Sequence, residues 1–177
     1  MITNKFYIAL FILLNTALLL TGCKFENKNA ERTIFSEDGL FSVTLPKGWK
    51  QITDYSLNDI AEIQAMKIFG DRYFIASMEN KNDLEYNFDE WTELVIDIYL
   101  SASEKASISE GKDVLIGGQP AKQYEISATV DKVKIKILAT YINGENHFAQ
   151  ILAWTLASKY KSSFDDLNAI TNSIKGL

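Results

Sequence analysis

The chain contains a single histidine and a single cysteine, and this limits the chemistry that its side chains can perform. His147 follows the Asn143-Gly144 turn signal, and no Gly-x-Ser-x-Gly motif is present to display a nucleophilic serine beside it. A zinc site needs three or four Cys, His or carboxylate ligands, which one imidazole does not supply. The sequence therefore predicts no catalytic residue, no metal site and no cofactor, and we expect His147 to be an exposed side chain near a turn.

Acidic residues are numerous, but only one cluster has the spacing of a known site. Residues 83–89 alternate Asp, Glu and Asn with other residues, as the first ligands of a calcium loop do. However, Phe88 stands where such a loop needs glycine, and Leu94 stands where it needs a bidentate glutamate. We expect a solvated loop that leads into a helix N-terminus. A hydrolase that uses a pair of carboxylates stays open as an alternative, because nothing distinguishes one pair among the 23 acidic residues.

The cysteine lies at the end of an apolar leader. Lys5 precedes the apolar residues 6–20, which as a helix would be shorter than the ~30 Å hydrocarbon core of a bilayer. This order is typical of a secretory signal peptide. Leu20-Thr21-Gly22-Cys23 resembles the lipobox of bacterial lipoprotein precursors. The resemblance implies cleavage before Cys23, a diacylglyceryl thioether on its sulfur, and an acyl chain such as palmitate on its amine. An ordinary signal peptide, or an uncleaved anchor with an incidental cysteine, is the alternative.

The lipobox divides the chain into three parts. Residues 1–22 are predicted to be the signal peptide, residues 23–33 the lipidated N-terminus with its polar tether, and residues 34–177 a single domain. Two or three acyl chains hold a protein on a membrane persistently, whereas one chain binds only marginally. We therefore expect a lipid-anchored protein on the extracytoplasmic face of the cell membrane, or on the outer membrane if the host has one. With Cys23 lipidated, the domain has no cysteine left to form a disulfide.

The composition excludes some classes of partner. The formal net charge is −5, and nucleic-acid binding needs a basic surface, so we expect no nucleic-acid partner. Low proline, modest glycine and 47% hydrophobic residues argue against disorder.

Two segments have the periodicity of helices. Residues 88–102 carry an apolar stripe formed by Trp91, Leu94, Val95, Ile98 and Ala102, with Asn87 as the candidate N-cap. Residues 164–175 repeat the pattern, with Ser163 as the expected N-cap.

The rest of the domain has the patterns of strands. We expect a strand at 41–45, a hairpin of 62–69 with 72–79 around Gly70-Asp71, and strands 112–116 and 121–128 on either side of residues 117–120. Alternation over 133–139, followed by Asn143-Gly144 as a type I′ turn, predicts a final hairpin in which 147–155 is a central strand. The three tryptophans, Trp49, Trp91 and Trp154, are expected in the core. Together these elements predict an α+β domain in which helices cover an antiparallel sheet.

The element order resembles that of a known family. Residues 39–49, Gly-Leu-Phe-Ser-Val-Thr-Leu-Pro-Lys-Gly-Trp, resemble the opening strand and Pro-x-Gly-Trp turn of PsbP-like domains. The mid-chain helix, the Gly-Gly-Gln-Pro-Ala hairpin, the strand pair of residues 141–155 and the closing Asn-Ser-Ile-Lys at 172–175 follow in the matching order. The resemblance implies an α/β/α sandwich, in which helices flank an antiparallel sheet, and members that act as accessory or binding subunits. It carries no functional residue over to this chain.

These observations favour a non-enzymatic module, anchored through Cys23, that binds an envelope protein or complex. A small-molecule-binding lipoprotein is one alternative, and it predicts an apolar pocket of roughly 300 Å³ or more between sheet and helix. The carboxylate-pair hydrolase is the other, and it predicts two buried carboxyls with raised pKa values in one cleft.

Overall fold

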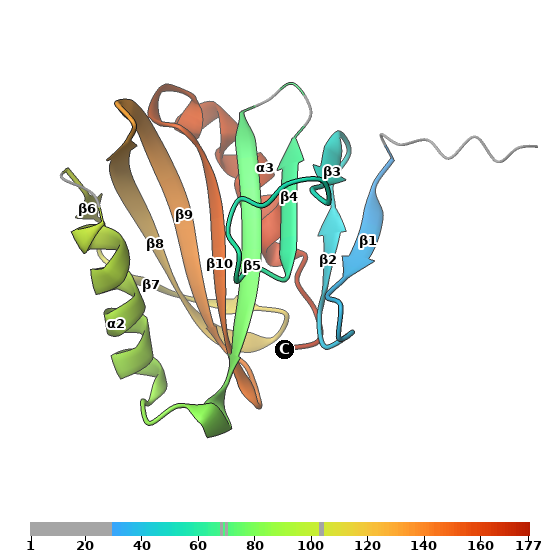
Figure 1. Cartoon of the computed structure of the whole chain (residues 1–177), viewed down its shortest axis with the longest axis vertical. Coiled ribbons are helices and arrows are strands. Elements are labelled where there is room, and N and C mark those ends of the chain that lie inside the picture. The colour runs from blue at the N-terminus through green and yellow to red at the C-terminus, as the bar shows by residue number, and fades with distance from the viewer. Residues whose placement is uncertain (1–29, 68, 70, 103–104) are drawn as a thin grey trace, which may run out of the picture.

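The computed structural model describes residues 30–67, 69, 71–102 and 105–177 (Figure 1). The predicted signal peptide and Cys23, the predicted lipidation site, lie outside these residues. The first strand, β1 (Arg32–Phe35), pairs with β2 (Ser42–Leu45) in a small two-stranded sheet. Arg32 and Thr33, which the sequence analysis assigned to the tether, are thus part of β1.

An antiparallel sheet of eight strands forms the middle of the molecule. Its order is β3-β4-β5-β10-β9-β8-β6, and β7 also pairs with β8. The strands are β3 (Trp49–Gln51), β4 (Ile63–Lys67), β5 (Arg72–Asn80), β6 (Ser107–Ile108), β7 (Lys112–Ile116), β8 (Gln119–Val130), β9 (Val133–Asn143) and β10 (His147–Leu156). The three predicted hairpins are confirmed, and β10 is the predicted central strand because it lies between β5 and β9.

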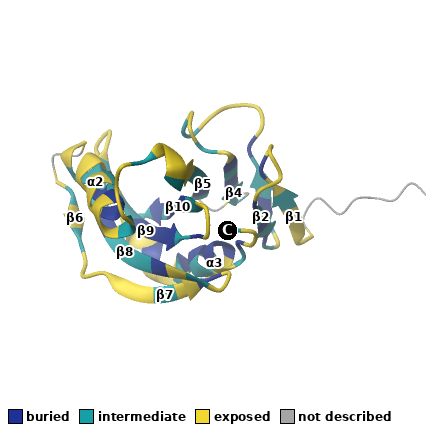
Figure 2. Cartoon of the chain, turned by 90° about the horizontal axis from the view of Figure 1, so that it is seen from below, coloured by how far each residue is buried: buried dark blue, intermediate teal, exposed yellow. Residues whose placement is uncertain are grey.

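Two helices lie on opposite faces of this sheet, α2 (Phe88–Ser101) on one and α3 (Tyr160–Asn172) on the other (Figures 1 and 2). Short 3-10 turns, η2 (Lys81–Asp83) and η3 (Ala157–Lys159), lead out of β5 and β10. The predicted α+β class, an antiparallel sheet between helices, is therefore confirmed. Of the described helices, none is long and apolar enough to cross a membrane.

The N-terminus of α2 is closed as the sequence predicts. The Asn87 side chain accepts hydrogen bonds from the backbone N–H groups of Asp89 and Glu90 at 3.0 and 3.1 Å, and the Glu90 carboxylate accepts from the Asn87 N–H at 2.9 Å. The buried face of the helix differs from the predicted stripe, because Leu94 and Ile98 are exposed. The buried residues of α2 are instead Trp91, Thr92 and Ile96.

The prediction for α3 is wrong at both ends. The helix begins at Tyr160, whose buried ring packs edge-on against Phe164 and so extends the helix by one turn. Ser163 is therefore not an N-cap but a fully buried residue within the helix. The helix ends at Asn172, and Lys175 instead exchanges two backbone hydrogen bonds with Ser42.

The type I′ turn occurs at a different hairpin from the predicted one. Asp131 and Lys132 both have positive φ, 48° and 68°, and they join β8 to β9 directly after the pair Val130 and Val133. The predicted turn at Asn143-Gly144 opens into a longer connection. In this connection the Lys81 ammonium group donates hydrogen bonds to the Asn143 side chain at 2.7 Å and to the Gly144 carbonyl at 2.6 Å.

Each face of the sheet carries its own hydrophobic core. The core under α3 contains Trp49 and many fully buried residues, and the core under α2 is centred on Trp91 and Tyr141. Both cores are built from residues in the range 34–177.

Candidate functional site

A groove opens on the α2 side of the sheet, and we call it the α2-face groove. It has a volume of about 490 Å³. Most of its lining is apolar and comes from β5, β8, β9 and β10, from the β3–β4 connection and the β8–β9 turn, and from the last turn of α2. The described lining residues are Leu57, Asn58, Ile75, Tyr99, Val130, Asp131, Val133, Ile135, Ile137, Leu152 and Trp154.

Strand alternation provides the floor of the groove. Ile75, Leu152 and Ile137 project from β5, β10 and β9 on the α2 side, and each is less than a tenth exposed. Trp154 continues this floor and stacks on Tyr73 of β5, with ring centroids 5.4 Å apart. The floor is thus the outer end of the α2-side core, left uncovered by the helix.

A single glutamine holds one wall of the groove in place. The wall is the connection between β3 and β4, which crosses in front of the sheet in Figure 1 and contributes Leu57 and Asn58. The Gln64 side-chain carbonyl on β4 accepts from the N–H of Leu57 at 2.6 Å, and its amide donates to the carbonyl of Asn58 at 3.1 Å. These bonds hold the middle of the connection against β4, and the backbone bond from the Ile52 N–H to the Gln64 carbonyl holds its start.

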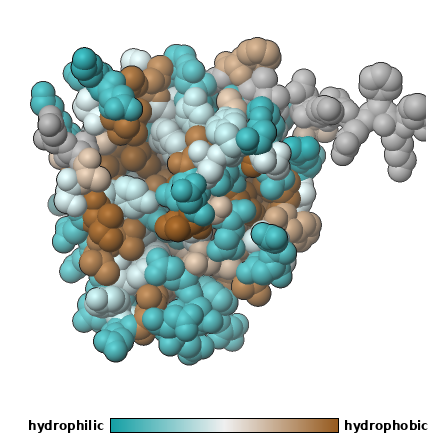
Figure 3. Space-filling model, in the orientation of Figure 1, coloured by the Kyte–Doolittle hydropathy of each residue, from teal (hydrophilic) through white to brown (hydrophobic). Residues whose placement is uncertain are grey.

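The opposite rim is the β8–β9 hairpin. The tight Asp131-Lys132 turn brings Val130 and Val133 side by side at the mouth, where they are 51% and 46% exposed. Figure 3 shows a band of hydrophobic side chains on this face, over the upper parts of β8 and β9 beside α2. Apolar surface at the mouth of an apolar groove favours entry of an apolar ligand.

Polar groups collect at the inner end of the groove. Tyr99, which lines the groove, donates a long 3.4 Å hydrogen bond from its hydroxyl to the side-chain carbonyl of Gln150. Gln150 is 7% exposed, and its amide nitrogen has no hydrogen-bond partner among the described residues. The hydroxyl of Tyr141, which lies opposite Gln150 on β9, has none in the same part of the chain.

Burial sets the acidity of these two phenols. It raises the pKa of Tyr99, and it raises the pKa of Tyr141 further, because Tyr141 is fully buried. The Gln150 side chain opposes the increase at both, although no hydrogen bond of normal geometry joins it to Tyr141. Both hydroxyls are therefore neutral donors at any physiological pH.

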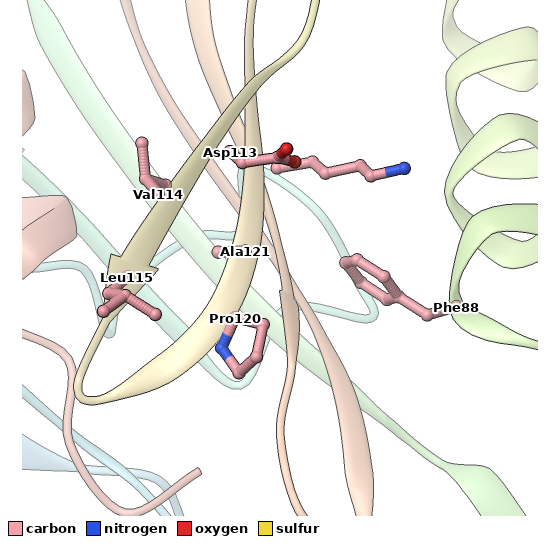
Figure 4. A pocket seen from close by; sticks show the side chains of 7 residues that line it. Phe88, Asp113, Val114, Leu115, Pro120 and Ala121 are labelled. Atoms are coloured by element: carbon pink, nitrogen blue, oxygen red, sulfur yellow. The ribbon is translucent and has the colours of Figure 1, made fainter.

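A second pocket, of about 600 Å³, lies between the start of α2 and the β7–β8 hairpin (Figure 4). Phe88 points from α2 toward Pro120 and Ala121 on β8, and Asp113 lies beyond them. The cation in its lining, Lys122, is already paired with Asp89 at 2.7 Å, which raises the Lys122 pKa. Because its cation is already paired with Asp89, this pocket offers an anionic ligand little charge to bind.

The residues that resemble the start of a calcium loop lead into the N-terminus of α2, as expected. Asn87 and Glu90 form the cap, and Asp89 pairs with Lys122. No group of three or more His, Cys, Asp or Glu residues in the described part of the chain has the geometry to hold a metal ion. His147 begins β10 next to the turn, and it is half-buried rather than exposed as predicted.

One carboxyl has the raised pKa that the hydrolase hypothesis requires. Partial burial raises the pKa of Glu62, although the Met78 N–H that it accepts at 3.0 Å works in the opposite direction. The nearby Asp38 carboxylate raises it further, but Asp38 is exposed, and hydrogen bonds from Ser36 and the Leu40 N–H lower its own pKa. These two carboxyls do not form the buried pair that the hypothesis describes.

Two of the three tryptophans lie in the core, as predicted. The polar side chains at the inner end of the groove were not predicted. Trp49 and Trp91 are buried, whereas Trp154 lines the groove. Gln150 was detectable, because it is the one amide within an otherwise apolar central strand. Tyr99 was not, because its position depends on how α2 is rotated about its axis.

No family model matches the chain, and no curated protein matches it in sequence. Solved structures do match it in fold. Cyanobacterial PsbP (CyanoP) from Synechocystis sp. PCC 6803 is 10% identical, with a TM-score of 0.63 over 88% of this chain and 98% of that one. LpqN, involved in cell envelope biogenesis of Mycobacterium tuberculosis, is 13% identical, with a TM-score of 0.52 over 82% and 89%. A mutant of the protein Mog1 is 11% identical, with a TM-score of 0.54 over 81% and 94%.

At these identities the similarity concerns the fold. The chain has the PsbP-like α+β fold that residues 39–49 and the order of elements predicted.

Proposed function

We propose that this protein is a non-enzymatic binding module of the bacterial cell envelope, anchored through lipidated Cys23, which holds a small apolar molecule in the α2-face groove. The observation that carries the proposal is the groove itself. Its volume of about 490 Å³ lies within the range of ligand sites and exceeds what the small-molecule hypothesis required. Its lining is mostly apolar, with few polar groups, as in sites that bind lipid-like molecules.

The fold supports a binding role rather than catalysis. LpqN, which shares the fold, is involved in cell envelope biogenesis, and a location at the envelope is what the lipobox of this chain implies. An anchored carrier would meet apolar molecules at the membrane surface, where they are concentrated. The expected protein partner is compatible with this role, since an accessory subunit can present or receive the bound molecule.

Binding can be tested with a neutral fluorescent probe, N-phenyl-1-naphthylamine, and the soluble chain of residues 24–177. We expect a saturable rise in probe fluorescence, together with a change in the intrinsic emission of Trp154. Trp154→Phe should remove most of the intrinsic change and retain the probe signal.

The matched variants are Val133→Asp in the groove and Leu115→Asp outside it. Both replace an exposed apolar strand residue by the same carboxylate, and Leu115 is 72% exposed on β7. We expect Val133→Asp to weaken probe binding by about fivefold or more, because a carboxylate in an apolar lining must be desolvated. Leu115→Asp should bind as the unchanged chain does. Equal loss in both variants, or no saturable binding at all, would reject the groove as the site.

The anchor is tested separately. Mass spectrometry of the native protein should find residues 1–22 removed and Cys23 carrying diacylglycerol. The Cys23→Ser chain should leave the membrane fraction, and a bare Cys23 thiol in the native protein would contradict the anchor without affecting the groove.

A further inference from the structure

The buried polar groups beyond the groove indicate the chemical class of its ligand. Resting on the proposed binding function, we infer that the α2-face groove selects a neutral, elongated apolar molecule with a carbonyl oxygen, such as a fatty ester or amide, and that Gln150 and Tyr141 donate hydrogen bonds to that oxygen.

The lining of the groove carries no positive charge among the described residues. Among the described residues that line the groove, Asp131 is the one with a charged side chain, and it lies at the mouth. A fatty-acid carboxylate or a phosphate would enter past this carboxylate and find no cation in the lining to pair with. Burying an unpaired anion is costly, so the lining discriminates against anionic ligands.

Two buried hydrogen-bond donors lie next to the groove. The Gln150 amide nitrogen donates to nothing in the described part of the chain, and the Tyr141 hydroxyl is in the same position. Buried donors are nearly always satisfied in folded proteins, and leaving one unsatisfied is unfavourable. A carbonyl oxygen accepts two hydrogen bonds, which matches two donors that lie opposite each other in register on β10 and β9.

Gln150 can be reached from the floor of the groove. Gln150 lies two residues from Leu152 on the same side of β10, which is about 7 Å along the strand from the floor of the groove. Tyr99 lines the groove, and its hydroxyl is held to the Gln150 side-chain carbonyl only by a 3.4 Å hydrogen bond, which is long and therefore weak. If the Tyr99 ring moves aside, the carbonyl oxygen of the ligand can accept a hydrogen bond from the Gln150 amide nitrogen while the apolar chain of the ligand stays on the floor.

The test compares three ligands with the same chain length: methyl decanoate, decanoate at pH 8, and decane. Each displaces N-phenyl-1-naphthylamine from the chain of residues 24–177. We expect methyl decanoate to displace the probe at a concentration about five to ten times lower than the other two do, the value of one or two hydrogen bonds. If decanoate or decane displaces the probe as well as the ester, the inferred ligand class is wrong and the binding function stands. If the probe itself never binds, the proposed function is wrong.

Gln150→Leu keeps the size of the side chain and removes the amide donor. It should weaken binding of methyl decanoate by about 3- to 10-fold relative to binding of decane. Unchanged binding of the ester would overturn the role of Gln150.

A spectroscopic measurement on the unchanged chain avoids dependence on folding of the variant. The infrared carbonyl band of methyl decanoate labelled with ¹³C at the carbonyl should move to lower frequency on binding, as hydrogen bonding requires. A band at the frequency found in hydrocarbon solvent would contradict the inference.

Discussion

The two faces of the central sheet are built from the same strands, yet they are packed differently. On β10, the residues that point toward α3 are Ala149, Ile151 and Ala153, and they belong to the tightly packed core. The alternate residues Gln150, Leu152 and Trp154 point toward α2, and they include a glutamine and a partly exposed tryptophan. One face is thus closed and the other partly open, although consecutive residues supply both.

Side-chain size explains the difference. Alanines on the α3 side allow the helix to approach the sheet, and α3 lies close to β10 along its length. On the α2 side, the Trp91 ring packs on Phe148 at 5.1 Å and edge-on against Tyr141 at 5.8 Å between ring centroids. These aromatic rings fill the space between the start of α2 and the strands. The groove opens beside the last turn of α2, where Tyr99 forms part of its lining.

The largest predicted difference between the faces comes from two neighbouring residues of β10. Ile151→Ala creates a cavity in the closed core and should lower the free energy of unfolding by about 2–5 kcal/mol. Leu152→Ala removes a similar side chain whose site opens into the groove, so water or a shifted neighbour fills the space, and we expect a loss of about 1–2 kcal/mol. Urea unfolding followed by circular dichroism measures both. An equal or larger loss for Leu152→Ala would show that the α2 face is as closed as the other.

Ion pairs provide a second, smaller comparison. On α3, the Asp166 carboxylate binds Lys67 at 2.5 Å and Arg72 at 3.0 Å, and all three side chains are mostly buried. On α2, Asp89 binds Lys122 and is 68% exposed. We expect Asp166→Asn to cost about 1–2 kcal/mol, and Asp89→Asn about half as much, mainly through its place at the helix N-terminus.

The two ion pairs should also respond differently to salt. The thermal stability of the Asp89→Asn chain should approach that of the unchanged chain as ionic strength rises, since exposed charges are screened. The difference for Asp166→Asn should persist. Identical salt dependence would mean that Asp166 is no better shielded than Asp89.

The sequence predicts well what depends on neighbouring residues. The Asn87 cap and the strand predicted from residues 133–139 depend on local sequence, and both are confirmed. The rotation of α2 is not local: the predicted stripe placed Leu94 and Ile98 inside, but packing of Trp91 against Phe148 and Tyr141 turns them outward. The helix start at Ser163 was wrong for the same kind of reason, since burial of Tyr160 depends on the sheet beneath it.

The sequence analysis offered an apolar pocket between sheet and helix only as an alternative, and the residues that form the groove were not predicted because they come from segments far apart in the chain. Its walls are the β3–β4 connection and the β8–β9 hairpin, and its inner end combines Tyr99 with Gln150. Periodicity indicates which residues face inward, but it does not show where a helix stops covering a sheet. The one available signal was the amide of Gln150 among apolar neighbours.

The smallest predicted effect concerns the groove wall, whose β3–β4 connection ends at Glu62. The Glu62 pKa is raised above its ordinary value of 4.5 mainly by burial, so folding favours the protonated form. The stability that this provides is fully present below pH 4.5 and is lost as the pH rises through the folded-state pKa. Glu62→Gln imitates the protonated form, and its side-chain carbonyl can still accept from the Met78 N–H.

Glu62→Gln should therefore raise the stability at pH 7, by less than about 1 kcal/mol because the side chain is half-exposed, and should change nothing at pH 3.5. Thermal unfolding at the two pH values measures the difference. A variant less stable at pH 7 would show that the carboxylate, through its bond to Met78, holds the wall in place rather than opposing it. Probe binding should be unchanged in either case, because Glu62 does not line the groove.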